Sequence, residues 1–177
     1  MKNILILLLL FPMSTFAQKF VSDQSNIRFY SSAPIEDIEA INEKAKSVID
    51  LSNGQVVFSV DIEGFQFEKA LMQEHFNENY LESEKYPKST FKGQIEDWNN
   101  IQGAQEVKVT GDLMIHGITK KVVLGGTIDV SENKVEVESV FIVKLVDYKI
   151  KIPKAVFYSI AEEIEVTVKF VYKPYSK

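Results

Sequence analysis

Residues 107–130 read Val107-Lys-Val-Thr-Gly-Asp-Leu-Met-Ile-His116-Gly117-Ile-Thr-Lys-Lys-Val-Val-Leu-Gly-Gly-Thr-Ile-Asp-Val130, and this stretch decides the fold. On both sides of His116-Gly117, apolar or small residues alternate with mostly polar ones at a period of two. Successive side chains of a β-strand point to opposite faces, so this period indicates two strands that each have one apolar face. The stretch therefore predicts a β-hairpin that turns at His116-Gly117.

The same alternation recurs over most of the chain. Apolar side chains take every second position in residues 25–30, 56–62, 135–145 and 164–172, and Ser131-Glu-Asn-Lys134 has the composition of a hairpin turn. Closely spaced strands with turn signals between them favour an antiparallel sandwich or barrel over alternating βαβ units. We therefore predict an all-β fold in one domain.

Two stretches depart from this period. In the first, Ala70 to Glu82, the residues Leu71, Phe76 and Tyr80 lie near helical spacing, which predicts a short helix with one apolar face. The second, residues 34–50, also fits a helix by local propensity, because its apolar residues recur at helical intervals.

The N-terminus has the pattern of a secretory signal peptide, cleaved after residue 17. Lys2 supplies a positive charge, residues 4–11 are all apolar, and Thr15-Phe16-Ala17 places small residues at the −3 and −1 positions. The apolar run is shorter than the roughly 18 residues of a membrane span. We therefore expect an exported protein, periplasmic or secreted, whose mature domain is residues 18–177.

Composition excludes several kinds of function. The chain has no cysteine, so the domain has no disulfide and no thiolate metal ligand. Its formal net charge is −5 and it has no basic stripe, which argues against nucleic acid or an anionic membrane surface as a partner. We expect neither nucleic-acid binding nor stable membrane insertion.

Three segments resemble the YceI-like family, and the opening strand Ser25-x-Ile-x-Phe29 also fits it. Residues 70–91 are similar to the family's helix followed by a "YP…F" pattern, and Val109 to Val122 is similar to its "G-x-L-T-I-H-G-V-T-K" hairpin. Val146-Asp-Tyr-Lys-Ile150, with the strand that follows Glu163, resembles its "D-F-G-I" segment and closing strand. These pieces have the family's order and spacing, and the resemblance covers nearly all of residues 18–177.

The resemblance implies an eight-stranded antiparallel, lipocalin-like barrel with a short α-helix near one end. It also implies that the interior binds a polyisoprenoid chain, in some members that of a quinone. For residues 34–50 it implies extended chain, which conflicts with local propensity; we follow the resemblance, since tertiary pairing overrides propensity. Two departures stand out: Met114 replaces a frequent Thr, and Tyr148-Lys149 replaces Phe-Gly, which removes a permissive glycine.

The leading hypothesis is an extracytoplasmic carrier, not an enzyme, that holds a polyisoprenoid or similar long-chain amphiphile inside the barrel and needs no cofactor. A barrel of about eight strands is either filled by its side chains or wide enough for one slender ligand. Plain core packing is therefore an equally open role for each candidate residue. The candidate tunnel-lining residues are Phe29, Phe58, Phe91, Leu113, Ile115 and Phe141, and the candidate mouth residues are Phe76 and Tyr80.

Two other classes of function stay open. One is an enzyme that acts on such a lipid with His75 as general base, beside Glu74 or Glu78. The other is a structural barrel with a filled interior and no ligand. His75 and Glu78 share a helix face, but a metal site needs three or four ligands, so we predict no metal site. The sequence leaves the oligomeric state open, with a homodimer as one possibility.

Overall fold

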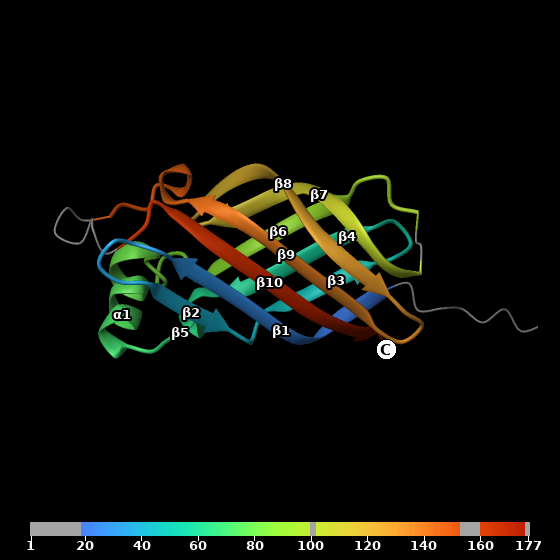
Figure 1. Cartoon of the computed structure of the whole chain (residues 1–177), viewed down its shortest axis with the longest axis horizontal. Helices are drawn as coiled ribbons and strands as arrows, with labels where there is room; N and C mark the ends of the chain where they lie inside the picture. The colour runs from blue at the N-terminus through green and yellow to red at the C-terminus, as the bar shows by residue number, and fades with distance from the viewer. Residues whose placement is uncertain (1–18, 100–101, 153–159, 176–177) are drawn as a thin grey trace, which may run out of the picture.

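The alternating stretches form long antiparallel strands that wind into a barrel (Figure 1). This computed structural model describes residues 19–99, 102–152 and 160–175, and the predicted signal peptide lies outside them. The strands are β1 (Lys19–Ser31), β2 (Ile38–Asn42), β3 (Lys46–Asp50), β4 (Gln55–Asp61), β5 (Gln66–Phe67), β6 (Lys88–Ile95), β7 (Gly103–Ile115), β8 (Ile118–Val130), β9 (Val135–Lys144) and β10 (Glu163–Pro174).

These ten stretches make eight barrel strands, as the resemblance implied. β3 and β2 lie end to end along β1, which pairs with β3 near Phe20 and with β2 near Phe29. In the same way, β4 pairs with β3 and the short β5 pairs with β2. The other edge of β1 pairs with β10 and closes the sheet into a barrel.

Residues 34–50 form strands β2 and β3, so the extended alternative is correct and the propensity-based helix is wrong. Ile38 and Ala40 are buried on one face of β2, and Ile49 is buried on β3. The break between the two strands follows Asn42, whose buried amide donates to the Asp61 carbonyl and accepts from the Lys44 amide. Pairing with β1 and burial of the apolar face outweigh the local helix propensity of this segment.

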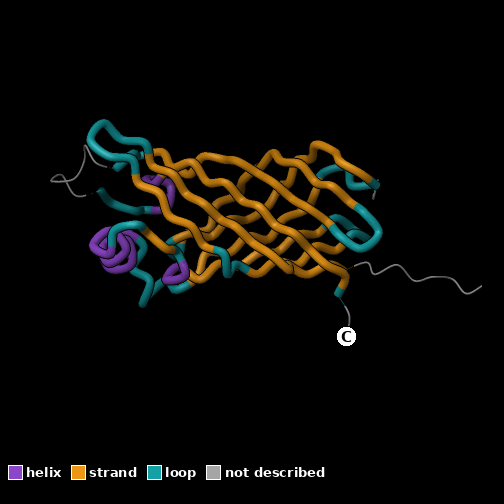
Figure 2. Tube along the Cα trace, turned by 60° about the horizontal axis from the view of Figure 1, so that its bottom comes forward, coloured by secondary structure: helices purple, strands orange, loops and turns teal. Residues whose placement is uncertain are grey.

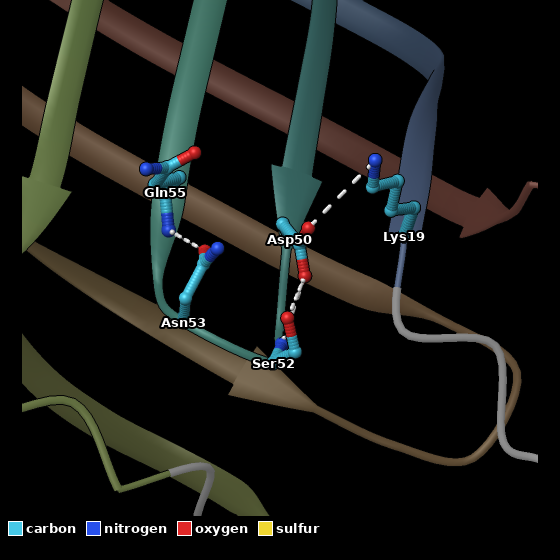
Figure 3. A network of polar contacts seen from close by, with 5 residues as sticks. All are labelled: Lys19, Asp50, Ser52, Asn53 and Gln55. Carbon is cyan, nitrogen blue, oxygen red and sulfur yellow. Dashed lines mark hydrogen bonds and ion pairs between the residues drawn. The ribbon is translucent and has the colours of Figure 1, made fainter.

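The turn between β3 and β4 is held by local polar contacts at one end of the barrel (Figure 3). The Asp50 carboxylate accepts from the Ser52 amide and hydroxyl at 3.0 and 2.5 Å, and it lies 4.0 Å from the Lys19 ammonium. The Asn53 side chain accepts from the Gln55 amide at 2.9 Å. Gly54 completes the turn at φ 72°, a conformation that favours glycine.

This same end of the barrel is filled by side chains, and we call it the closed end. Phe20, Ile49 and Tyr172 are almost fully buried there. The Ser47 hydroxyl donates to the Val57 carbonyl, so the Tyr172 hydroxyl donates to Ser47 Oγ at 2.8 Å. Burial raises the pKa of the Tyr172 phenol, which therefore stays protonated. The filled end thus needs no ligand to be stable.

The opposite end, which we call the mouth, carries the helical turns (Figure 2). They are η1 (Ile62–Gly64), α1 (Ala70–His75), the π-helical turn η2 (Phe76–Tyr80) and η3 (Leu145–Tyr148). The predicted helix is confirmed, but its inward face is wrong at one position: Leu71 is 62% exposed, whereas Met72 points toward the barrel interior. No helix in the described part of the chain is long and apolar enough to span a membrane.

Tyr172→Ala tests whether the closed end stabilises the fold. Removing a buried aromatic ring should lower the free energy of unfolding by about 3–5 kcal/mol, because it leaves a cavity and unpairs Ser47. Tyr175→Ala is the control, since Tyr175 is half exposed and its loss should cost less than about 0.5 kcal/mol. Urea denaturation followed by Trp98 fluorescence measures both, and equal effects would contradict the assignment.

Candidate ligand cavity

An apolar cavity of about 160 Å³ occupies the mouth half of the barrel. Side chains from every barrel strand except β8, and from the helical turns at the mouth, form its wall, and no charged side chain is among them. The polar side-chain groups at the wall are the hydroxyls of Ser31, Ser89 and Tyr80. Burial raises the pKa of Tyr80, so that phenol is neutral. The cavity therefore suits a ligand that is mostly hydrocarbon.

Seven of the eight candidate residues lie at the wall of this main cavity, and one does not. Phe91 is buried behind Phe58, with the two rings stacked at 5.2 Å, because the β6 position that it occupies faces the deeper interior. Phe91 instead lines a second apolar cavity. The residues at the main cavity are Phe29, Phe58, Leu113, Ile115, Phe141, Phe76 and Tyr80.

The second cavity, of about 60 Å³, lies next to the main one and toward the closed end. Phe58, Phe141 and Val168 belong to both walls, so these three side chains form the narrowing between the cavities. Past them, Ile49 and Tyr172 end the second cavity at the filled core. The barrel interior is thus hollow over part of its length and solid over the rest.

Four phenylalanines pack together on the mouth side of the main cavity. Phe76 of η2 lies against Phe29, Phe65 and Phe67, with ring centroids 5.3, 5.6 and 5.0 Å apart. Aromatic pairs at these separations stabilise each other beyond their buried area. Phe76 therefore attaches the short helix to the barrel through ring contacts.

Several wall residues near the mouth were not among the candidate residues predicted from the sequence. Phe65, Phe67 and Met72 line the cavity, although they lie outside any clear alternating run. Leu145 of η3 and Ile150, the second residue after η3, also reach the wall. For Leu145 the alternation of the preceding strand was a usable signal, whereas Phe65 and Phe67 are placed only by the pairing of β5 with β2.

His116 connects three segments of the mouth. Its Nδ1 donates to the Tyr148 carbonyl at 3.1 Å, and its Nε2 lies 2.6 Å from Oε2 of Glu82. The Tyr86 ring packs edge-on against the imidazole, with centroids 4.5 Å apart. The Tyr148 carbonyl belongs to η3, so this bond joins the turn between β7 and β8 to η3. His116 therefore fixes η3, which supplies Leu145 to the cavity.

Lys149 stands in a conformation that glycine prefers. It follows η3 at φ 56°, in the left-handed region, where its amide bonds the Val146 carbonyl. This is the position at which the family pattern has glycine. A side chain with a Cβ pays roughly 1–2 kcal/mol in this region. Lysine in place of the family's glycine keeps the turn but adds backbone strain beside the mouth.

The residues of the enzyme alternative are not gathered at the cavity. His75 lies on α1, yet it is at the wall of neither apolar cavity. Within the described ranges, no three side chains of His, Asp or Glu are grouped as a metal site would require. The geometry at the wall supports binding of an apolar ligand and offers no group for proton transfer other than hydroxyls.

His116→Asn tests the role of this side chain at the mouth. Asparagine tolerates the positive φ of position 116 but is too short to make both contacts, so the free energy of unfolding should fall by about 1–2 kcal/mol. His75→Asn is the matched control and should change stability by less than about 0.5 kcal/mol. Thermal unfolding of the two variants measures the difference, and an unchanged His116→Asn protein would refute the assignment.

Lys149→Gly should make the protein more stable by about 1 kcal/mol, because glycine adopts the left-handed conformation without strain. Lys151→Gly is the control: it removes the same charge from a nearby exposed residue with no positive φ, so it should give no gain. Denaturant midpoints compare the two. A destabilised Lys149→Gly variant would show that the lysine side chain, and not its backbone, matters at this turn.

The comparisons with known proteins agree with this geometry. The polyisoprenoid-binding domain from Saccharophagus degradans, implicated in plant cell wall breakdown, is similar at a TM-score of 0.76 and 15% identity, covering 90% of this chain and 99% of that one. Burkholderia cenocepacia BcnA has a TM-score of 0.71 and 19% identity, covering 83% of this chain and 95% of that one.

The YceI protein of Campylobacter jejuni, which crystallizes with large solvent channels, gives a TM-score of 0.67 and 18% identity, with 82% of this chain and 90% of that one covered. At these identities the likeness establishes the shared barrel fold. No curated protein matches the sequence. The sequence profile of the YceI-like domain matches residues 19–172, and the chain therefore belongs to the YceI-like family.

Proposed function

We propose that this protein is an extracytoplasmic carrier that holds the apolar chain of a polyisoprenoid, or of a similar long-chain amphiphile, inside its barrel. The single observation that carries the proposal is the cavity of about 160 Å³ with a wall free of charged side chains. Membership of the YceI-like family supports it, and so does the similarity to a domain described as polyisoprenoid-binding.

Burial of hydrocarbon supplies the binding energy in this proposal. Each buried carbon contributes roughly 0.8 kcal/mol, so each five-carbon isoprene unit contributes about 4 kcal/mol before other terms. Ordering the flexible chain and losing its free motion offset much of this gain. Affinity therefore depends on how many units lie inside. The hydroxyls of Ser31, Ser89 and Tyr80 are the groups that can bond a polar end of the ligand.

The cavity volume limits how much of the chain lies inside. An engineered protein cavity of about 150 Å³ accommodates a molecule the size of benzene. The main cavity of about 160 Å³ thus encloses a short piece of a prenyl chain, and the second adds about 60 Å³. A longer ligand must either displace wall side chains such as Phe76 or extend beyond the barrel.

The alternatives have less support. A structural barrel would be filled throughout, whereas the mouth half holds a cavity. An enzyme that used His75 would need this residue near the ligand, and it is at neither apolar wall. Export rests on the signal-peptide pattern of residues 1–17, so a periplasmic or secreted location is part of the proposal.

Organic extraction of the purified protein tests the proposal. Protein made in a quinone-producing host should release a long-chain lipid in nearly stoichiometric amount, identified by mass spectrometry. Phe58→Trp should reduce the retained lipid by about fivefold or more, because a larger ring fills the narrowing between the cavities.

Val57→Trp is the matched control, since Val57 precedes Phe58 on β4 and points to solvent at 44% exposure. It should retain as much lipid as the wild type. Wild-type protein that is properly folded but yields no lipid would overturn the carrier function. Equal lipid in the Phe58→Trp and wild-type proteins would overturn the placement of the ligand in this cavity.

A further inference from the structure

The wall of the barrel is incomplete between β8 and β9. Their ladder runs only from Val130 and Val135 to Gly126 and Ser139. Beyond that pair, β8 continues back to Ile118 and β9 continues to Lys144, yet the two edges do not pair with each other. Each strand stays paired on its other side over the same length, β8 with β7 and β9 with β10. The two strands separate toward the mouth (Figure 1).

Two glycines mark the point where the strands separate. A Cβ on Gly126 would lie 2.5 Å from the Glu138 carbonyl oxygen, so the last pair of the ladder depends on this glycine. A Cβ on Gly125 would have no atom within 4 Å. The Ser139 hydroxyl donates to the Gly125 carbonyl at 2.7 Å and links the strands at this point. Gly125 itself lies on the exposed outer face of β8, so a Cβ there would point into open space outside the barrel.

The second apolar cavity lies directly behind this gap. Leu124, Gly125, Ser139 and Phe141, which border the gap, are also part of that cavity's wall. The same cavity adjoins the main one at the narrowing formed by Phe58, Phe141 and Val168. The main cavity, the second cavity and the gap therefore adjoin one another in that order, from the mouth to the side of the barrel.

The outer border of the gap is also apolar. Val123 of β8 is 61% exposed, and Val140 and Ile142 of β9 are each 52% exposed, although outward positions of a barrel in water are ordinarily polar. Lys120 and Lys121 lie on the unpaired edge of β8. Charged lysines on an unpaired edge disfavour the addition of a strand from another chain. The surroundings therefore favour a hydrocarbon chain over a protein strand.

We propose that the gap between β8 and β9 is a side port through which the apolar chain of a long ligand passes out of the barrel. This proposal rests on the carrier function. It explains how cavities of about 160 and 60 Å³ serve a ligand that is too long for them: the chain end follows the second cavity and lies along Val123, Val140 and Ile142. With this port, the protein binds ligands whose apolar chains differ in length.

Crosslinking the two edges tests the port. The natural chain has no cysteine, so the double variant Val123→Cys/Ile142→Cys offers one reactive pair, which a short bismaleimide joins across the gap. The probes are radiolabelled farnesol, with three isoprene units, and solanesol, with nine, each delivered from detergent micelles. The measurement is the amount of each alcohol retained by the protein on gel filtration, before and after crosslinking.

Crosslinking should weaken solanesol binding by about tenfold or more, because the isoprene units that pass through the port can no longer be buried there. It should leave farnesol binding within about twofold of the uncrosslinked protein. The control is Val48→Cys/Val57→Cys, two exposed register partners on the fully paired strands β3 and β4. The same crosslink there should change neither alcohol.

Unchanged solanesol binding in the crosslinked protein would overturn the port, and so would an equal loss of both alcohols. Crosslinks that join two chains instead of closing one would also overturn it, since they would identify the gap as an interface between copies. A wild-type protein that binds neither alcohol would instead refute the carrier function, so the two failures are distinguishable.

Discussion

The pairing of β1 with three other strands is the constraint on which the rest of the structure depends. One edge of β1 bonds β3 and then β2, and its other edge bonds β10, so this strand closes the sheet into a barrel. Closure gives every strand one inward face, and the inward face of β1 carries Phe20 toward the closed end and Phe29 toward the mouth. The cavity is a consequence of that closure.

The two ends of the barrel differ because of what lies against the inward residues. At the closed end, the Leu51–Gly54 turn and Trp98 cover the interior, and the Trp98 indole donates to the Leu51 carbonyl. At the mouth the covering elements are short helical turns, held by the ring contacts of Phe76 and by the bonds of His116. Short, partly exposed elements are the ones that open locally at low cost, which suits the end that admits a ligand.

Part of the site could be predicted because period-two alternation identifies inward residues without any coordinates. Phe29, Phe58, Leu113, Ile115 and Phe141 lie at the main cavity for this reason, whereas Phe76 and Tyr80 reach it from the helical segment that the sequence also predicted. Phe91 is the exception, since alternation gives the face of a strand and not the depth along the barrel. Phe65 and Phe67 escaped prediction because the pairing of β5 with β2 places them, and that pairing joins distant parts of the chain.

The sequence by itself determined most of the long strands and their inward faces, the Ser131–Lys134 turn and the family, because these depend on local patterns and motif order. Between residues 34 and 50, local propensity favoured a helix and the family resemblance favoured extended chain; the tertiary structure decides for strands, since β2 and β3 pair with β1. It alone decided where the interior is empty and where β8 leaves β9. The cavity and the gap depend on the distances between elements that are far apart in the sequence, and the periodicity of one segment carries no information about those distances.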